Sequence, residues 1–162
     1  MTEAVGDRDR IIGGGLLRLL ADILVLEFKV RHLGWTMSDG NDLMRGTLLV
    51  SARQHLDSSA DEIARHVHLK AVRIPSMFND LSVMSSVKPA KAGEALEAAL
   101  REIAEDHGQI AQDAETLRVT LPIEEDQPTS SLIESLACCH RQRCDELREL
   151  LDVVHPDQSD RH

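Results

Sequence analysis

The residue pair Asp61 and Arg65 has a spacing that would place both side chains on one face of a helix. They are four positions apart, and a carboxylate and a guanidinium at that spacing can form an ion pair. The alternative is that both side chains point partly into solvent and contribute little to stability.

The same segment contains two further pairs, each made of a histidine and an acidic residue, and both residue types commonly bind metal ions. They are His55 with Asp57 and Glu62 with His66, and the second pair has the i,i+4 spacing of neighbours on a helix. Two ligands are too few to define a metal site. The alternative is a set of solvated polar residues on one helix face.

A second cluster near the C-terminus combines Cys138, Cys139, His140 and Cys144. His140 and Cys144 are one helical turn apart, and with a third ligand they would suit zinc or copper(I). Cysteine is also among the most buried residue types. The alternative is therefore plain core or interface cysteine, and Cys139 falls on the apolar stripe of its segment.

Four long segments that could position these residues have apolar side chains every three or four positions. Each predicts an amphipathic helix, and they cover about residues 16–37, 42–70, 93–119 and 129–154. The connection over 71–92 is long for a bundle, and 76–84 predicts a short helix inside it. This order predicts one all-α domain over 1–162, a four-helix bundle over about 13–154 with a long crossover.

Composition limits the classes of partner. The chain has a formal net charge of −10, and neither tail is rich in lysine, so direct DNA binding is not expected. No apolar run reaches membrane-spanning length, and the N-terminus has no signal-peptide pattern. Three clustered cysteines do not suggest a secreted disulfide framework. We therefore expect a cytoplasmic protein without a membrane partner.

Three segments, in order and spacing, resemble the Dps miniferritins of the ferritin-like superfamily over nearly the whole chain. Residues 20–26 resemble the opening of the family's first helix, and 34–40 resemble its His-Trp-x-x-x-Gly segment with one extra residue before Gly40. Residues 61–65 resemble its Asp-Glu-Ile-Ala-Glu segment, and the spacing from Trp35 to Asp61 also matches.

This resemblance implies a hollow dodecameric homo-oligomer that oxidises ferrous iron with hydrogen peroxide and stores the ferric product. The family's ferroxidase centre lies between two-fold-related subunits. It takes the histidine of one first helix and the aspartate and glutamate of the partner's second helix. The resemblance thus makes iron the expected ion.

The family's three ligand positions correspond here to Gly34, Asp61 and Arg65, so only the aspartate is kept. We expect the arginine to supply a fixed positive charge where the family holds iron. The ferroxidase centre is then degenerate, and its activity weak or absent. Candidate residues near these positions are His32, Trp35, His55, Asp57, Glu62 and His66.

An acidic loop, Glu124-Glu125-Asp126, joins the third and fourth segments. In Dps shells acidic residues in this neighbourhood line pores that admit cations, and the alternative is an ordinary solvated loop. Two functions follow from the resemblance. One is an iron-handling, stress-protective cage with weak ferroxidase activity. The other is a non-catalytic structural cage that kept the fold and lost the iron chemistry.

Overall fold

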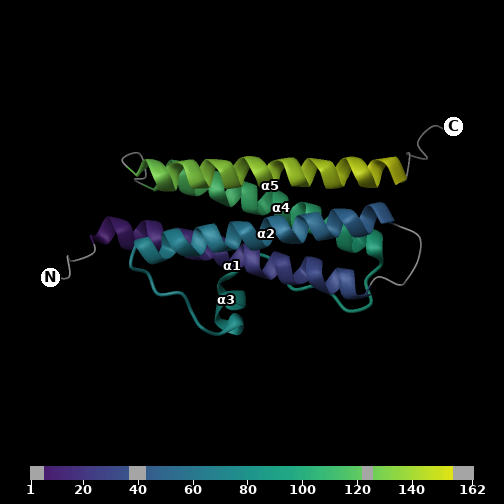
Figure 1. Ribbon diagram of the computed structural model, residues 1–162, viewed down its shortest axis with the longest axis horizontal. Coiled ribbons are helices and arrows are strands. Elements are labelled where there is room, and N and C mark those ends of the chain that lie inside the picture. The colour runs from purple at the N-terminus through teal and green to yellow at the C-terminus, as the bar shows by residue number, and fades with distance from the viewer. Residues whose placement is uncertain (1–5, 37–42, 122–125, 155–162) are drawn as a thin grey trace.

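Five helices form the described structure, a computed structural model that covers residues 6–36, 43–121 and 126–154; the side chains of 43–45 and 154 are left out. The helices are α1 (Asp7–Thr36), α2 (Leu43–Leu69), α3 (Phe78–Met84), α4 (Leu96–Thr120) and α5 (Gln127–Val154). The covered ranges contain no strand. The four long helices lie side by side, and α3 lies outside them (Figure 1). The expected all-α bundle is confirmed.

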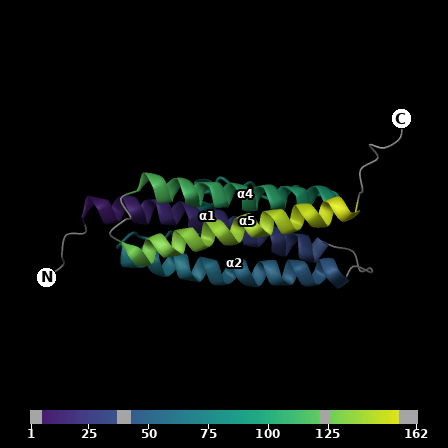
Figure 2. The same ribbon diagram turned by 90° about the horizontal axis from the view of Figure 1, so that it is seen from above.

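Two helix hairpins make up the bundle. The helix α1 packs along α2, α4 packs along α5, and α1 also contacts α4. Both views show the four helices running nearly parallel to one axis (Figures 1 and 2). The crossover from α2 to α4 carries α3, which packs on α1. This confirms the long crossover with its short extra helix.

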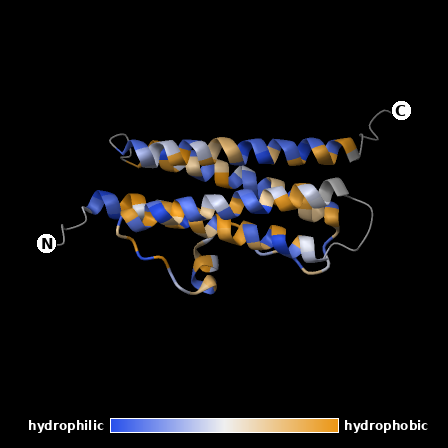
Figure 3. Ribbon diagram, in the orientation of Figure 1, coloured by the Kyte–Doolittle hydropathy of each residue, from blue (hydrophilic) through white to orange (hydrophobic). Residues whose placement is uncertain are grey.

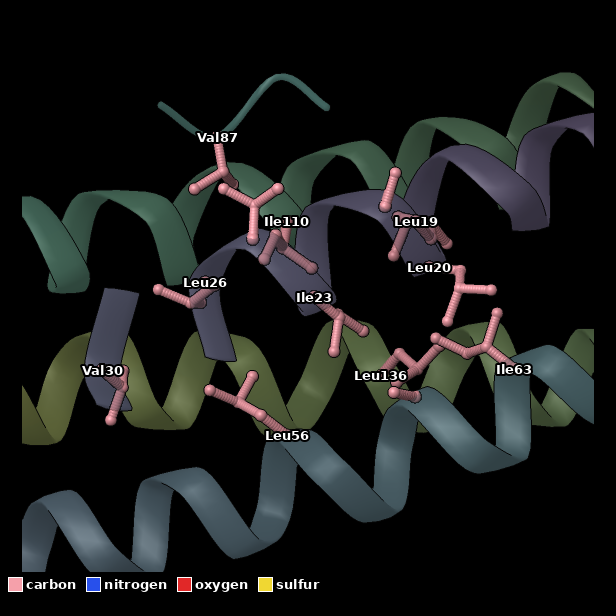
Figure 4. Close-up of a cluster of buried hydrophobic side chains, with 14 of the residues drawn as sticks. Leu19, Leu20, Ile23, Leu26, Val30, Leu56, Ile63, Val87, Ile110 and Leu136 are labelled. Carbon is pink, nitrogen blue, oxygen red and sulfur yellow. The ribbon is translucent and has the colours of Figure 1, made fainter. Parts of the chain in front are cut away.

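Apolar side chains from all four long helices meet along the bundle axis. Ile23 and Leu26 of α1 are fully buried, as are Leu56 of α2 and Ile110 of α4, and they lie together in Figure 4. Polar residues cover much of the outer side of α5 (Figure 3). Within the described ranges, none of the helices has the length and apolar character needed to cross a membrane.

Two helices begin earlier than the sequence pattern indicates. The helix α1 starts at Asp7, ahead of the expected bundle start near residue 13, because packing outweighs the low helix propensity of three consecutive glycines. The helix α5 starts at Gln127 and includes Pro128, since a proline in the first turn lacks only an N–H that has no partner there. The backbone N–H of Thr129 donates to the Asp126 carboxylate at 3.2 Å, which caps this end.

The consecutive glycines Gly13 and Gly14 in α1 provide a matched pair of substitutions. A Cβ on Gly13 would collide with the Val72 side chain and lie 2.9 Å from Cβ of Lys70, whereas one on Gly14 meets nothing within 4 Å. We expect Gly13→Ala to lower the free energy of unfolding by about 1–3 kcal/mol. Gly14→Ala should raise it by about 0.5–1 kcal/mol, because alanine favours the helix. Urea unfolding followed by circular dichroism measures both, and equal effects would contradict the close packing at Gly13.

Candidate metal centres

The three positions that correspond to the family's ligands all lie on the outside of the subunit. Gly34 is exposed near the end of α1, and Asp61 and Arg65 are exposed on α2. A Cβ built on Gly34 meets no atom within 4 Å. In the described part of this single chain, Asp61 and Arg65 do not pair with each other. Their ion pair therefore stays a prediction for an assembled interface.

Next to Gly34, three aromatic rings form an exposed surface that we call the aromatic face: Phe28, Trp35 and Phe78. The Phe28 ring lies edge-on to the Trp35 ring with centroids 6.2 Å apart, and 5.7 Å from that of Phe78 on α3. Trp35 is 66% exposed. A group of large apolar side chains open to water is typical of an interaction surface.

The polar residues of α2 lie in different surroundings. Asp57 and Glu62 are exposed, whereas His55 and His66 are partly buried. The His66 Nδ1 atom lies 3.4 Å from the Thr129 hydroxyl of α5. The two members of each pair thus differ in burial, and a metal site at either pair stays a prediction. His32 on α1 is also partly buried.

The C-terminal cluster separates in the structure. Cys138 is exposed, Cys139 is partly buried and Cys144 is buried, and all three are free thiols. The expectation that Cys139 belongs to the core stripe is therefore wrong by one position. The buried face of α5 carries His140 and Cys144. Among the residues that the structure describes, no group of three or more His, Cys, Asp or Glu side chains could hold a metal ion.

Sequence reasoning missed a group of three imidazoles inside the bundle, His55 of α2, His107 of α4 and His140 of α5, which we call the histidine cluster. The Nδ1 atoms of His107 and His140 are 2.9 Å apart, a hydrogen-bond distance. Their ring centroids are 4.9 Å apart, and the His55 ring is 6.1 Å from that of His140. His107 is 1% exposed and His140 is 0% exposed.

Each ring of the histidine cluster has one nitrogen atom with an unmet hydrogen bond. The Nε2 atoms of His55, His107 and His140 are buried without a partner. Leaving such a polar atom unpaired costs about 1–3 kcal/mol. Between His107 and His140 only one Nδ1 can donate, so one Nε2 carries a hydrogen and the other a free lone pair.

Burial keeps all three rings neutral. It lowers the pKa of His140 to about 3, with a smaller contribution from His55. It also lowers the pKa of His107 well below the usual value, reinforced by His140, His55 and Arg143. The pKa of His55 is lowered by burial and then by Arg143. Neutral rings offer lone pairs that no proton occupies at physiological pH.

A small cavity adjoins His107. It leaves about 10 Å³ open to the centres of water molecules, which is about the minimum for one water. The residues around it come from α2, α4 and α5 and are mostly apolar: Leu48, Leu49, Ala52, Ile103, His107, Arg143, Glu146 and Leu147.

In the acidic loop, the structure describes only Asp126; Glu124 and Glu125 lie outside the described residues. Besides capping α5, the Asp126 carboxylate lies 2.5 Å from the Lys70 ammonium. That ammonium also lies 2.9 Å from the carboxylate of Asp9. Asp126 thus makes its contacts inside the subunit and joins the ends of α2 and α5.

Two buried charged residues of α1 were also missed, because they lie on a stripe that looks apolar. The Lys29 ammonium is 2.7 Å from the Asp106 carboxylate and 3.1 Å from that of Glu102, both on α4. The Asp22 carboxylate accepts hydrogen bonds from the Ser85 hydroxyl at 2.8 Å and the Ser86 N–H at 2.6 Å. These contacts hold α1 against α4 and against the crossover.

Comparison with known proteins gives structural matches alone. No family model and no curated protein matches the sequence. The Dps protein of Vibrio cholerae O1, described as a ferritin-like diiron-carboxylate protein, superposes with a TM-score of 0.81 at 14% identity, over 89% of this chain and 91% of that one. Dps from Thermosynechococcus elongatus gives 0.81 at 17% identity, over 92% and 95%. DpsC from Streptomyces coelicolor gives 0.82 at 18% identity, over 93% and 90%. The chain therefore has the ferritin-like fold of the Dps structures.

Proposed function

We propose that this chain is a subunit of a Dps-type cage for iron handling and stress protection, in which peroxide-dependent iron oxidation is weak or absent. The observation that carries the proposal is the placement of Gly34, Asp61 and Arg65. All three are exposed on the outer side of α1 and α2, where a second subunit could reach them. Only Asp61 offers a ligand for iron.

The aromatic face supports assembly into a homo-oligomer. Phe28, Trp35 and Phe78 lie together in the open on α1 and α3, and covering them would remove apolar surface from water at about 25 cal/mol per Å². A second copy of the chain is the occupant that the fold comparison favours. The resulting assembly is a closed shell, a dodecamer on the family pattern.

The charges at the interface positions disfavour iron binding. A ferrous ion prefers carboxylate and imidazole ligands with open positions for the oxidant. Gly34 supplies no donor atom, and the Arg65 guanidinium would repel a second cation next to Asp61. Since the net charge is −10, any protection of DNA would be chemical and would not require binding to the duplex.

Iron oxidation by the assembled protein tests this function. Light scattering at micromolar concentration should give the mass of a closed shell. Stoichiometric Fe²⁺ followed by hydrogen peroxide should give ferric absorbance that rises no faster than in a protein-free control. A monomer or dimer would contradict the cage, and rapid oxidation would contradict the degenerate centre.

The second candidate is a structural cage without iron chemistry, favoured by the same two replacements at Gly34 and Arg65. The two functions differ in the fate of the ferric product. An iron-handling cage should keep ferric iron soluble and co-eluting with the shell in size-exclusion chromatography. A structural cage should elute free of iron while ferric oxide precipitates as it does without protein.

A further inference from the structure

We propose that His107 and His140, which we call the imidazole pair, form an acid-operated switch in the packing of α4 on α5. At neutral pH the hydrogen bond between the two rings joins the helices. Acidification separates the rings and opens this contact. The switch lies inside one subunit, and it does not depend on the proposed iron function.

The hydrogen bond of the imidazole pair exists in only one protonation pattern. The two Nδ1 atoms are 2.9 Å apart, so one ring donates its hydrogen and the other must keep a lone pair. A first added proton can occupy only the Nε2 atom of the donating ring. A second would place two N–H groups against each other at Nδ1. The pair therefore takes up two protons only if its rings move apart.

The surroundings of the imidazole pair disfavour even the first proton. His107 is 1% exposed and His140 is 0% exposed, and the Nε2 atom of each ring is buried without a hydrogen-bond partner. An imidazolium there would be a buried charge whose Nε2–H group donates to nothing, which is costly. Opening the contact brings water to that group and removes the cost.

The titratable groups that face the imidazole pair also oppose an added proton. The His55 ring of α2 has its centroid 6.1 Å from that of His140, so it adds a third base and no negative charge. Arg143 of α5 lines the cavity beside His107. Its guanidinium lies 2.9 Å from the Glu146 carboxylate, which offsets part of its positive charge. A nearby positive charge disfavours the charged form of a histidine.

The buried charges of α1, the other helix that packs on α4, have partners of their own. Lys29 pairs with Asp106 and Glu102 of α4. Asp22 accepts hydrogen bonds from the crossover. Because these carboxylates are already paired or hydrogen-bonded, they offer little compensation for a proton on the imidazole pair.

The switch should act below neutral pH. An unfolded histidine has a pKa of about 6.5, whereas burial lowers the pKa of His140 to about 3 and that of His107 well below its usual value. Between these values the open form binds protons that the closed form does not bind, so acidification favours opening. For two rings the opening equilibrium constant should rise by up to about a hundredfold per pH unit below about pH 6.

The reactivity of the Cys144 thiol measures the opening. Cys144 is buried on α5, and its sulfur lies 3.3 Å from the position of a Cβ built on Gly108 of α4. Separation of the two helices would therefore expose it. Cys138 is exposed on the same helix and provides an internal control. Labelling of the full-length protein with a maleimide, followed by peptide mass spectrometry, gives the ratio of the Cys144 rate to the Cys138 rate.

This rate ratio should rise at least about tenfold in the unmodified protein between about pH 7 and about pH 5. The double variant His107→Leu with His140→Leu should abolish the rise. It removes both partners together, so no buried polar ring loses its partner. The control His68→Leu removes an exposed histidine of α2 and should leave the rise unchanged.

Three results would overturn the proposal. The first is a constant rate ratio in the unmodified protein, a measurement that requires no variant to fold. The second is an equal rise in a double leucine variant that circular dichroism shows to be helical at neutral pH. The third is loss of the helical signal of the unmodified protein at about pH 5, since general unfolding would then expose Cys144 without a switch at this contact.

Discussion

Lys29→Met is expected to lower the free energy of unfolding by about 3–5 kcal/mol, because it removes one partner from a buried group of charges. Lys29 is 4% exposed, and its ammonium lies between the carboxylates of Asp106 and Glu102. Methionine fills about the same volume as lysine, so the change in the free energy of unfolding comes more from the lost charge than from lost packing. Asp106 would remain partly enclosed with no other described cation near it. Chemical denaturation at neutral pH measures the change.

Lys91→Met is the matched control, since Lys91 also pairs with Glu102 but is 69% exposed. Solvent screens an exposed ion pair, which adds little to stability, so the same substitution there should have little effect. The double variant Lys29→Met with Asp106→Leu should recover most of the lost stability, because it removes the buried ammonium together with its partly buried carboxylate partner. Equal losses at Lys29 and Lys91 would contradict the role of burial.

The pH dependence of the Lys29→Met variant provides a further check. Burial raises the pKa of Asp106 even with Lys29 beside it, since Lys29 only partly opposes the effect. Without Lys29 the folded pKa should rise further above its unfolded value. Such a carboxyl group favours the fold at low pH and loses that contribution as the pH rises through the folded pKa. The deficit of the variant should therefore shrink on acidification.

The long helices could be predicted because their signal is local. Apolar side chains at helical spacing, such as Leu16, Leu19 and Ile23, are buried as expected. Pro128 was misleading at the start of α5, because proline occurs both just before a helix and within its first turn. The apolar pattern thus predicted the presence of the helices better than the residues at which they begin and end. The helix ends depend on contacts such as that of Asp126 with Thr129.

The histidine cluster could not be predicted, because its members come from three separate helices. His107 lies on an apolar stripe and His140 next to two cysteines, and they are 33 positions apart. Helical spacing places His107 on an apolar stripe, but the stripe expected for α5 ran through Cys139 and not His140. Only the packing of α4 on α5 brings the rings of His107 and His140 together.

The ligand positions Gly34 and Arg65 are clear in the sequence because they lie in motifs with fixed spacing. Their consequence depends on an interface between chains, and one chain shows only that the positions are exposed. A restoration experiment therefore tests more than a deletion would, since it requires both the fold and the interface to have the family geometry.

Arg65→Glu combined with Gly34→His should restore peroxide-dependent iron oxidation. The double variant places a carboxylate at position 65, next to Asp61 on α2, and an imidazole at position 34 on α1. These are the three ligand types that the resemblance implies. The new histidine should fit, since a Cβ at Gly34 meets no atom within 4 Å. Removing the guanidinium also removes the repulsion of a second cation.

The rate at which ferric absorbance rises after Fe²⁺ and peroxide are added measures this gain. We expect an increase on the order of tenfold or more over the unmodified protein, because altering even the residues around metal ligands changes metal affinity or activity by about that factor. Arg65→Glu with Gly34→Ala is the control, because it restores the carboxylate and changes the backbone without adding an imidazole. It should oxidise iron more slowly than the double variant with histidine. If the two variants behave alike while the proposed shell forms, Gly34 does not lie opposite the carboxylates, and the interface between subunits differs from the Dps pattern.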